Sequence, residues 1–276
     1  MNFPLFSIII PTLNEELFIP KLLKDLTKHK ENNFEIIIVD SLSQDKTKDV
    51  VQSFTKLLPL YFIENDRKNI SVQRNFGAKK AKGKYFVFLD ADSRVEPSFT
   101  KKLRKAIEKK KGLFFVQRLK TDDPNTEAQY IMDIVNFLFE VSQNLNRPFA
   151  LGGGMFLEKN YFFTIGGFDE KLEFGEDYDI ARRSFKWGVR AKFLSDVAVV
   201  YSLRRIRREG KLQAYYKYFM STAYYLIRGK TQRKLFDYEL GGHLYQNYKG
   251  KSRSNKDLLE TLLNKAKKAF KNLLEE

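Results

Sequence analysis

Two aspartates one residue apart, Asp90 and Asp92, follow a run of apolar residues in the stretch YFVFLDADSR. Aromatic and β-branched residues without alternation are typical of a strand covered on both faces, as in a parallel sheet. Side chains alternate along a strand, so both carboxylates should emerge on one side if the extended geometry continues to Asp92. Two neighbouring negative charges need a counter-charge, and ligands of open α/β sheets bind at the carboxyl ends of strands. The pair therefore predicts a site for a divalent cation.

A second group of acids follows a glycine in the sequence GEDYD, at Glu176, Asp177 and Asp179. The group opens an expected helix, and a helix N-terminus stabilises the charged carboxylate that a general base requires. Simple helix capping explains the same residues equally well, so both interpretations stay open. Asp40 ends the strand EIIIVD, as Asp90 ends its own strand. Asp40 either joins Asp90 at one edge of the sheet or caps nearby amides.

The composition limits the chemistry further. The chain of 276 residues has no cysteine and two histidines, His29 and His243. Disulfides, thiolate metal sites and a cysteine nucleophile are therefore excluded, and a bound metal should be a hard cation with oxygen ligands. Lysine and arginine outnumber aspartate and glutamate by 50 to 34, a formal charge of +16. This excess favours an anionic partner: nucleic acid, a phosphate-bearing ligand or an anionic membrane.

Short apolar strands alternate with amphipathic helices through the first part of the chain. The expected strands span residues 6–10, 35–39, 60–63, 85–89, 113–116, 151–157 and 191–194. The expected helices span residues 15–28, 45–57, 71–81, 98–109, 126–145 and 178–186. This alternation predicts an α/β fold with a mostly parallel sheet flanked by helices.

The C-terminal part of the chain is expected to be helical. Residues 212–229 are rich in tyrosine and flanked by basic side chains, so this helix either packs on the domain or lies at an anionic membrane surface. Residues 254–274 carry one apolar stripe, typical of a docking helix or a self-association element. No apolar run approaches the roughly 20 residues that span a bilayer, and the N-terminus lacks a basic leader. We therefore expect a cytoplasmic protein.

Five motifs occur in the order and approximate spacing of family 2 glycosyltransferases, which have the GT-A fold. They are IIIPTLNE, EIIIVDSLSQDKT, SVQRNFGAKKAKGKYFVFLDADS, GGFDE and GEDYD. The resemblance covers residues 6–210 and implies one GT-A domain in residues 1–210. In that domain, residues 1–120 would bind the nucleotide sugar and residues 121–210 the acceptor, while residues 211–276 would form a helical extension.

The resemblance also implies roles for individual residues. Asp92 would bind Mg²⁺ or Mn²⁺, Asp90 would face the ribose or the metal sphere, and Asp177 would be the catalytic base. The residues expected to bind the nucleotide sugar are Pro11, Thr12, Asn14, Glu15, Asp40, Arg74, Asn75, Gly77, Asp90, Ala91 and Asp92. The residues expected to line the acceptor site are Gly153, Gly154, Gly167, Phe168, Asp169 and Glu176.

The implied reaction is an inverting transfer of a single sugar from a nucleotide-diphosphate sugar, in glycan or cell-envelope synthesis. Asp177 would take the proton from an acceptor hydroxyl, whereas a lipid-phosphate acceptor is already anionic and needs the base less. The cation would neutralise charge on the leaving diphosphate. The expected partners are the nucleotide sugar, a sugar or lipid-linked acceptor and the inner face of an anionic membrane, with no specific nucleic acid.

The sequence departs from the family pattern in two places. Asp40-Ser41-Leu42-Ser43 stands where many relatives have Asp-Asp-Gly-Ser, and Tyr201-Ser202 stands where many carry a histidine metal ligand. The Gln-x-x-Arg-Trp pattern of processive synthases is not evident, which favours single-sugar transfer. The alternatives are a nucleotidyltransferase, a basic membrane- or nucleic-acid-binding protein, and a relative that binds nucleotide without turnover. The acidic stretch PTLNEE argues against the first, and the DAD and GEDYD motifs argue against the second.

Overall fold

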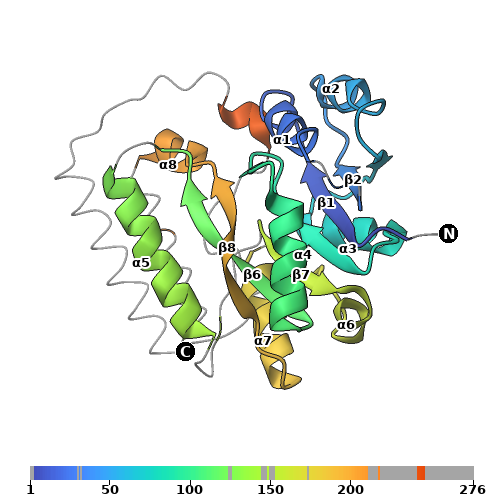
Figure 1. Ribbon diagram of the computed structural model, residues 1–276. Helices are drawn as coiled ribbons and strands as arrows, with labels where there is room; N and C mark the ends of the chain where they lie inside the picture. The colour runs from blue at the N-terminus through green and yellow to red at the C-terminus, as the bar shows by residue number, and fades with distance from the viewer. Residues whose placement is uncertain are drawn as a thin grey trace.

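The strands of the protein form one sheet in a computed structural model, which describes residues 3–29, 31, 33–123, 126–143, 148, 153–172, 174–210, 217 and 241–245. The order of the eight strands is β3-β2-β1-β4-β7-β6-β8-β5 (Figure 1). Their bounds are β1 (Phe6–Thr12), β2 (Phe34–Asp40), β3 (Leu60–Glu64), β4 (Tyr85–Phe88), β5 (Arg94–Val95), β6 (Phe114–Thr121), β7 (Met155–Glu158) and β8 (Lys192–Tyr201). The α/β fold expected from the sequence is confirmed.

The sheet has a parallel half and a mixed half. Strands β3, β2, β1 and β4 are parallel, so their carboxyl ends share one edge. Strand β7 runs antiparallel to both β4 and β6, while β6 and β8 are parallel to each other. Because β1 lies between β2 and β4, the ends of β2 and β4 share an edge without being neighbours.

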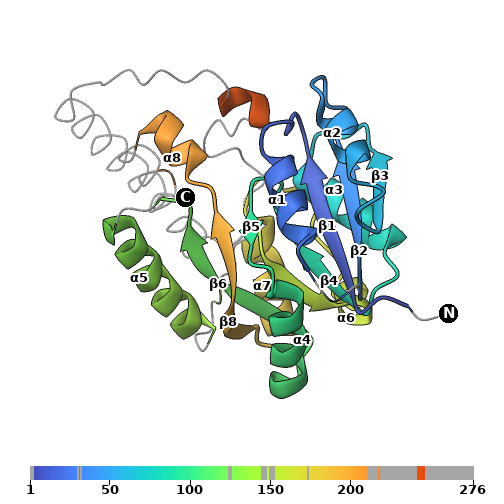
Figure 2. The same ribbon diagram turned by 45° about the horizontal axis from the view of Figure 1, so that its top comes forward.

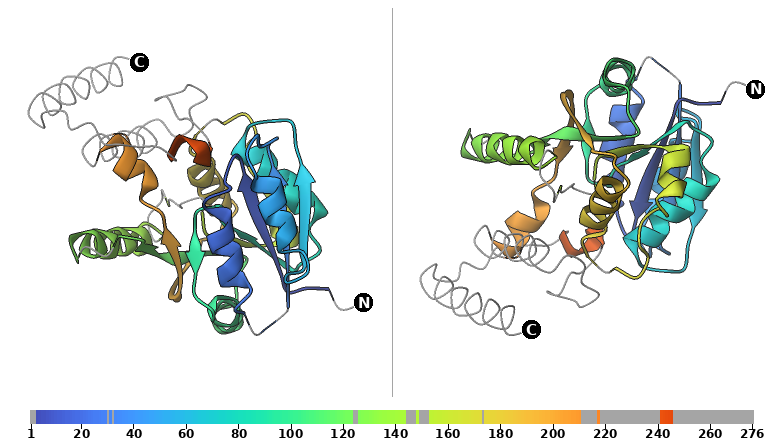
Figure 3. Two further views of the ribbon diagram at one scale, coloured as in Figure 1. Left: turned by 90° about the horizontal axis from the view of Figure 1, so that it is seen from above. Right: turned by 90° about the horizontal axis from the view of Figure 1, so that it is seen from below.

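Helices cover both faces of the sheet. Their bounds are α1 (Ile19–Leu26), α2 (Thr47–Ser53), α3 (Ile70–Lys80), α4 (Phe99–Lys110), α5 (Thr126–Ser142), α6 (Lys159–Thr164), α7 (Glu176–Lys186), α8 (Arg204–Glu209) and the 3-10 helix η1 (Gly242–Tyr245). Buried residues of α1, α2 and α4 pack on one face, and those of α3, α5, α6 and α7 pack on the other. Seen along the sheet, α5 lies on the β6 side, at the opposite end from α2 and β3 (Figure 3).

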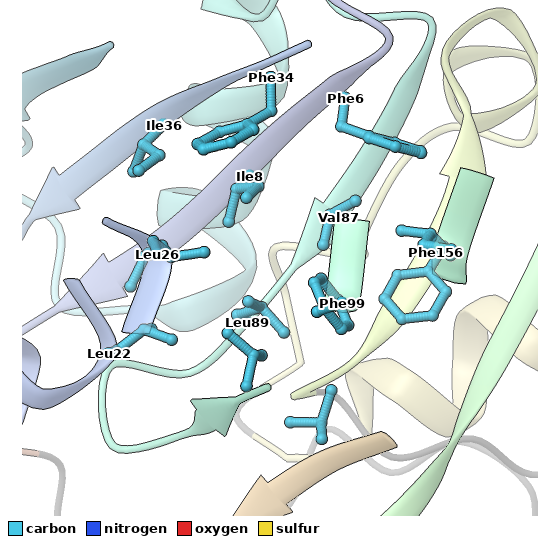
Figure 4. Packing of buried hydrophobic residues seen from close by; sticks show 14 of the residues in the cluster. Phe6, Ile8, Leu22, Leu26, Phe34, Ile36, Val87, Leu89, Phe99 and Phe156 are labelled. Atoms are coloured by element: carbon cyan, nitrogen blue, oxygen red, sulfur yellow. The ribbon is translucent and has the colours of Figure 1, made fainter. Parts of the chain in front are cut away.

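The apolar run before the aspartates is buried on both faces, as its composition predicts. Val87 and Leu89 belong to the layer that also contains Leu22 and Phe99 (Figure 4). Phe86 and Phe88 belong to the opposite layer. This central strand is therefore fixed from both sides, which makes its carboxyl end a rigid support for the residues that follow.

The extended geometry does not continue to Asp92. Strand β4 ends at Phe88, and the N–H of Ser93 donates to the carbonyl of Asp90 at 3.0 Å, which closes a turn. The condition for two carboxylates side by side on one strand is therefore not met. Asp90 and Asp92 point to different partners, as the site shows below.

The expectations for residues 212–229 and 254–274 lie outside the described residues, apart from Lys217. None of the helices in the described part of the chain has the length and apolar character needed to cross a membrane.

Candidate functional site

A buried arginine joins the end of β4 to the start of α7. Arg74 lies on α3 with 1% of its side chain exposed, and its Nη2 donates to Asp90 Oδ1 at 2.9 Å. Its Nη1 donates to Glu176 Oε1 at 2.8 Å. The guanidinium also lies over the ring of Phe168, 5.3 Å from the ring centroid. A buried guanidinium is stable only when paired, so Arg74 fixes the two acids in one place.

A second arginine joins the loop after β1 to the turn after β4. Arg204 opens α8, and its two terminal nitrogens donate to the two carboxylate oxygens of Glu15 at 2.7 and 2.8 Å. Its Nε lies 2.8 Å from Asp92 Oδ2, and its guanidinium lies 4.4 Å from the ring centroid of Phe18. Each arginine of the site thus pairs with two acids from different elements.

Burial changes the acid strength of this second group. It raises the pKa of Asp92 to about 7, an effect that Arg204 opposes and the charges of Asp90 and Glu15 reinforce. Burial also raises the pKa of Glu15, although Arg204 again acts in the other direction. These shifts show that the acids lie close enough to repel one another in a poorly hydrated place.

Tyr201 connects the aspartates of both groups. Its hydroxyl, at the end of β8, donates to the carbonyl of Gly153 and accepts a hydrogen bond from Gln117 Nε2 at 2.9 Å. Burial raises the pKa of Tyr201, and the charges of Asp90, Asp177 and Asp92 raise it further. The three aspartates predicted from the sequence are therefore within electrostatic reach of one buried hydroxyl.

The two candidate bases of the GEDYD motif have different surroundings. Asp179 is 1% exposed and pairs with Arg183, which also donates to the carbonyl of Gly167 at 2.6 Å. Asp177 is half-buried, and its Oδ1 accepts the N–H of Tyr178 at 2.8 Å. Asp179 thus supports the turn around Gly167, whereas Asp177 lies near the charges of the site.

The loops after β1 and β2 are tied together by Asp40. Its carboxylate accepts hydrogen bonds from Thr12 Oγ1 at 2.7 Å, Ser43 Oγ at 2.6 Å and Ser43 N at 2.8 Å. Asn14 has a left-handed backbone with φ 53°, and its Oδ1 accepts the N–H of Gln44 at 2.7 Å. Asp40 thus caps a nearby amide, that of Ser43, and lies at the same sheet edge as the end of β4, where it orders the loops beside the site.

A segment distant in sequence packs on this same edge. The N–H of Gly242 donates to the carbonyl of Leu13 at 3.0 Å, and the amide of Asn14 donates to Nδ1 of His243 at 2.9 Å. Figure 2 shows η1 beside the loop that follows β1, next to α8. A Cβ at Gly242 would lie 2.6 Å from Glu15 Oε2, so this close approach requires glycine.

The predicted acceptor residues line the site in part. An added Cβ at Gly153 would lie 2.8 Å from Asp90 Cγ, and one at Gly154 would overlap Gln117. Asn75 accepts the N–H of Phe168 at 2.9 Å and donates to its carbonyl at 2.8 Å, which holds the turn that follows Gly167. Asn75 thus contributes by positioning this turn.

Of the predicted residues, the structure brings together at one edge five acids, one arginine and one glycine: Glu15, Arg74, Asp90, Asp92, Gly153, Glu176 and Asp177. Other predicted residues lie elsewhere. Gly77 packs under the sheet, where an added Cβ would lie 2.6 Å from Ile9, and Ala91 is part of the core. Pro11 is buried within β1, and Asp169 accepts the N–H of Lys171 at 3.1 Å.

Asp92 fits a divalent cation as a single protein ligand. No group of three or more His, Cys, Asp or Glu side chains among the described residues is arranged to hold a metal. Mg²⁺, however, commonly uses one or two carboxylates together with substrate phosphates and water. The acids gathered here outnumber Arg74 and Arg204, so the cluster keeps an excess of negative charge that suits a cation.

Sequence reasoning missed the partners of these acids. Arg204 lies in a basic run that is equally typical of a solvated surface. The sequence feature that could have pointed to its role is its position soon after the expected last strand. Tyr201 was noticed as a replacement for a histidine, but not as a hydroxyl between three aspartates. Nothing in the sequence around His243 marks its contact with Asn14.

Comparisons with known proteins agree with this arrangement. Residues 7–166 match the family described as Glycosyl transferase family 2. An uncharacterized glycosyltransferase of Haemophilus influenzae is 30% identical over 179 residues, which are 63% of this chain and 60% of that protein. A "Dolichyl N-acetyl-alpha-D-glucosaminyl phosphate 3-beta-D-2,3-diacetamido-2,3-dideoxy-beta-D-glucuronosyltransferase" of Methanococcus voltae is 30% identical over 190 residues, 62% of this chain and 54% of that protein. The chain thus spans less than two thirds of either relative.

Two solved structures share the fold. Staphylococcus aureus TarS 1-349 in complex with UDP-GlcNAc has a TM-score of 0.61 and 21% identity, covering 82% of this chain and 67% of that one. The mannosyltransferase PcManGT of Pyrobaculum calidifontis, in complex with GDP-Man and Mn²⁺, has a TM-score of 0.63 and 20% identity, covering 83% and 64%.

Proposed function

This chain belongs to glycosyl transferase family 2, and we propose that it is an inverting, metal-dependent enzyme that transfers one sugar from a nucleoside-diphosphate sugar to a hydroxyl or a lipid phosphate. The observation that carries the proposal is the Arg74 bridge, which holds the end of β4 against the start of α7. The bridge holds Asp90, which is expected at the donor, against Glu176, the residue before the expected base Asp177. Family membership also favours a transferase over a nucleotidyltransferase or a non-enzymatic basic protein.

The donor would bind along the carboxyl edge of β1, β2 and β4. Asp40 and Asn14 order the loops at this edge through hydrogen bonds to neighbouring residues. Two proteins of similar fold have solved structures in complex with a nucleotide sugar, UDP-GlcNAc for TarS and GDP-Man for PcManGT. A nucleoside diphosphate carries negative charge, which suits a chain with a net charge of +16.

Asp92 would hold the divalent cation, which neutralises charge on the leaving diphosphate when bound. Arg74 keeps Asp90 in place beside it through a hydrogen bond of 2.9 Å. Gly153 lies so close to the Asp90 carboxylate that a larger residue would displace it. These residues fix the donor end of the site before any substrate arrives.

Asp177 would be the general base. It would accept the proton of an acceptor hydroxyl while that oxygen bonds to the anomeric carbon and the bond to the diphosphate breaks on the opposite face, which inverts the configuration. Asp179 is paired with Arg183 and Glu176 with Arg74, so the carboxylates of Asp179 and Glu176 have structural roles of their own. A lipid-phosphate acceptor would attack as an anion and would depend less on this residue.

The proposal is tested by Asp177→Asn. Donor candidates are first screened as UDP- and GDP-sugars with Mn²⁺, since a ligand that binds the folded form raises the melting temperature. The variant should keep metal-dependent binding of the matching nucleoside diphosphate in calorimetry, but lose transfer to a hydroxyl acceptor by about 100-fold or more. Asp133→Asn, on the exposed face of α5, should match the natural protein in both measurements. Retained turnover in Asp177→Asn would reject the role of the base.

The cellular location of the protein is a separate proposal. We propose a cytoplasmic enzyme that touches an anionic membrane through residues 212–229, which lie outside the described residues. Flotation with anionic liposomes at low and high salt tests this contact, because an electrostatic attachment weakens as salt increases. Absence of salt-sensitive flotation would reject it.

A further inference from the structure

The carboxylate expected to hold the cation already has a cationic partner. Arg204 Nε lies 2.8 Å from Asp92 Oδ2, while the other two nitrogens of the guanidinium bind both oxygens of Glu15. The side chains of Arg204 and Asp92 are each 16% exposed, so this contact is only partly hydrated. Arg204 comes from α8, beyond the residues matched by the family.

The position of Arg204 has a clear electrostatic reason. The carboxylates of Glu15 and Asp92 contact the same guanidinium, so their negative charges lie close together. Asp90 pairs with Arg74 instead, and Glu15 and Asp92 share Arg204. A guanidinium and a divalent cation repel each other, so both cannot occupy the same side of Asp92 without a large cost.

We propose that Arg204 exchanges with the divalent cation at Asp92 and becomes a ligand of the donor diphosphate. Without donor, Arg204 neutralises Asp92. When cation and diphosphate bind together, Arg204 leaves Asp92, and the edge of its guanidinium that carries Nε binds diphosphate oxygens while the terminal nitrogens stay on Glu15. The inference rests on the proposed function, because it requires a donor with a diphosphate group.

The two contacts of Arg204 suggest which part moves. The bidentate pair with Glu15 and the stacking on Phe18 anchor the guanidinium beside the loop after β1. The contact with Asp92 uses one nitrogen and can be given up while the anchor stays in place. Exchange therefore needs a small rotation of the side chain and no movement of α8.

The proposed exchange predicts a result that would not be expected if Arg204 had only a structural role. Removing the charge of Arg204 should strengthen binding of Mn²⁺ alone and weaken binding of the diphosphate. The gain in Mn²⁺ affinity of Arg204→Gln should be roughly tenfold, the scale on which a neighbouring charge changes the proton affinity of a carboxylate. The loss in affinity for inorganic pyrophosphate with saturating Mn²⁺ should also be roughly tenfold, as for a hydrogen bond to a charged group.

The experiment uses the full chain, with free Mn²⁺ measured by electron paramagnetic resonance and pyrophosphate binding by calorimetry. Arg207→Gln is the matched control, because Arg207 lies on the same helix and pairs with Asp122 outside the cluster. Arg204→Lys keeps the charge and should bind Mn²⁺ alone as weakly as the natural protein, even if the glutamine variant folds poorly. The double variant Asp92→Asn/Arg204→Gln should lose the gained Mn²⁺ affinity.

The outcomes separate the inference from the proposed function. If Arg204→Gln binds Mn²⁺ alone no better than Arg207→Gln, while the natural protein binds pyrophosphate with Mn²⁺, the exchange is rejected and the proposed function stands. A natural protein that does not bind pyrophosphate in the presence of Mn²⁺ would reject both.

Discussion

Arg74 shows how much of the site depends on one residue. Its guanidinium is buried and holds carboxylates from two elements, Asp90 and Glu176, that would otherwise repel each other. The buried pair need not add net stability, since both charges lost water to form it. Its effect is to fix the relative position of β4 and α7, which no hydrophobic contact could do with the same directionality.

Replacing Arg74 by Gln should destabilise the protein strongly. Breaking a buried ion pair leaves the partner acids uncompensated, which costs about 3 kcal/mol of the free energy of unfolding. Arg118→Gln removes an exposed pair with Asp133 and should cost at most about 1 kcal/mol. Urea unfolding of both variants measures the difference. Equal losses in the free energy of unfolding would mean that the buried pairs of Arg74 contribute no more to stability than the exposed pair of Arg118.

The sequence allowed the acids of the site and Arg74 to be predicted, but not Arg204. Asp90, Asp92 and Asp177 stand out because acids after apolar strands and at helix starts need a reason. Arg204 gives no such signal, because arginine is common on surfaces and its pairing with Glu15 depends on where α8 lies in the folded chain. The period-of-two argument did not apply at Asp92, because hydrogen bonding closes a turn there.

At the scale of elements, long and regular segments were predicted well. The strands Phe6–Thr12 and Phe34–Asp40 and the helix Phe99–Lys110 differ from expectation by no more than two residues at either end. Strand β8 (Lys192–Tyr201) was expected to end at residue 194. The polar residues Ser195 and Asp196 interrupt its apolar run there, and its pairing with β6 shifts register at the same place. Short elements such as β5, α6 and η1 have too few residues to show a period.

The element η1 gives a second prediction. An alanine at Gly242 would place its Cβ against Asn14 and 2.6 Å from Glu15 Oε2, so η1 must move off the loop after β1. We expect the affinity for the nucleoside diphosphate to fall about fivefold, or roughly 1 kcal/mol, with little change in melting temperature, since only a short element is displaced. Calorimetry and thermal unfolding measure the two effects.

Gly210→Ala serves as the control for this prediction. Unlike Gly242, Gly210 has a positive φ, 84°, and no described atom lies within 4 Å of an added Cβ. It should therefore introduce backbone strain without moving η1. Equal nucleotide affinity in the two alanine variants would show that the packing of η1 on the loop is irrelevant to donor binding.

For the whole molecule, His29 should set part of the pH dependence of stability. Its ring packs between Phe34 and Phe99, and its nitrogens meet the carbonyl of Glu96 at 3.1 Å and Thr100 Oγ1 at 3.2 Å. Burial lowers the pKa of His29, an effect that the Glu96 carbonyl and the charge of Asp25 only partly oppose. The unfolded chain, with a histidine pKa of about 6.5, then binds the proton more readily.

The free energy of unfolding should therefore decrease as the pH falls below about 6.5 towards the lower pKa of the folded state. His29→Gln removes this contribution, so its stability should change less between pH 7.5 and 5.5, as measured by urea unfolding. His243→Gln, at an exposed position, should keep the slope of the natural protein. Identical slopes in all three proteins would contradict the prediction.

The overall architecture was predictable because the strand–helix alternation and the ordered motifs both indicate the same α/β fold. The expected division at residue 120 does not coincide with a break in the sheet, since β6 (Phe114–Thr121) pairs with β7 and β8 in the same sheet. Contacts between the two ends of the chain, such as Asn14 with His243, could not be predicted. They depend on the path of the chain through three dimensions and leave no local pattern.

The pairing of Glu15 with Arg204 also bears on how the protein is made. Glu15 leaves the ribosome before Arg204, which emerges only after the strands of the sheet have been synthesised. Until then, the carboxylates of Glu15 and Asp92 lack this partner. A nascent chain stalled before residue 204 would thus have most of its core but two acids without their arginine, so we expect this edge of the sheet to be completed only after the core.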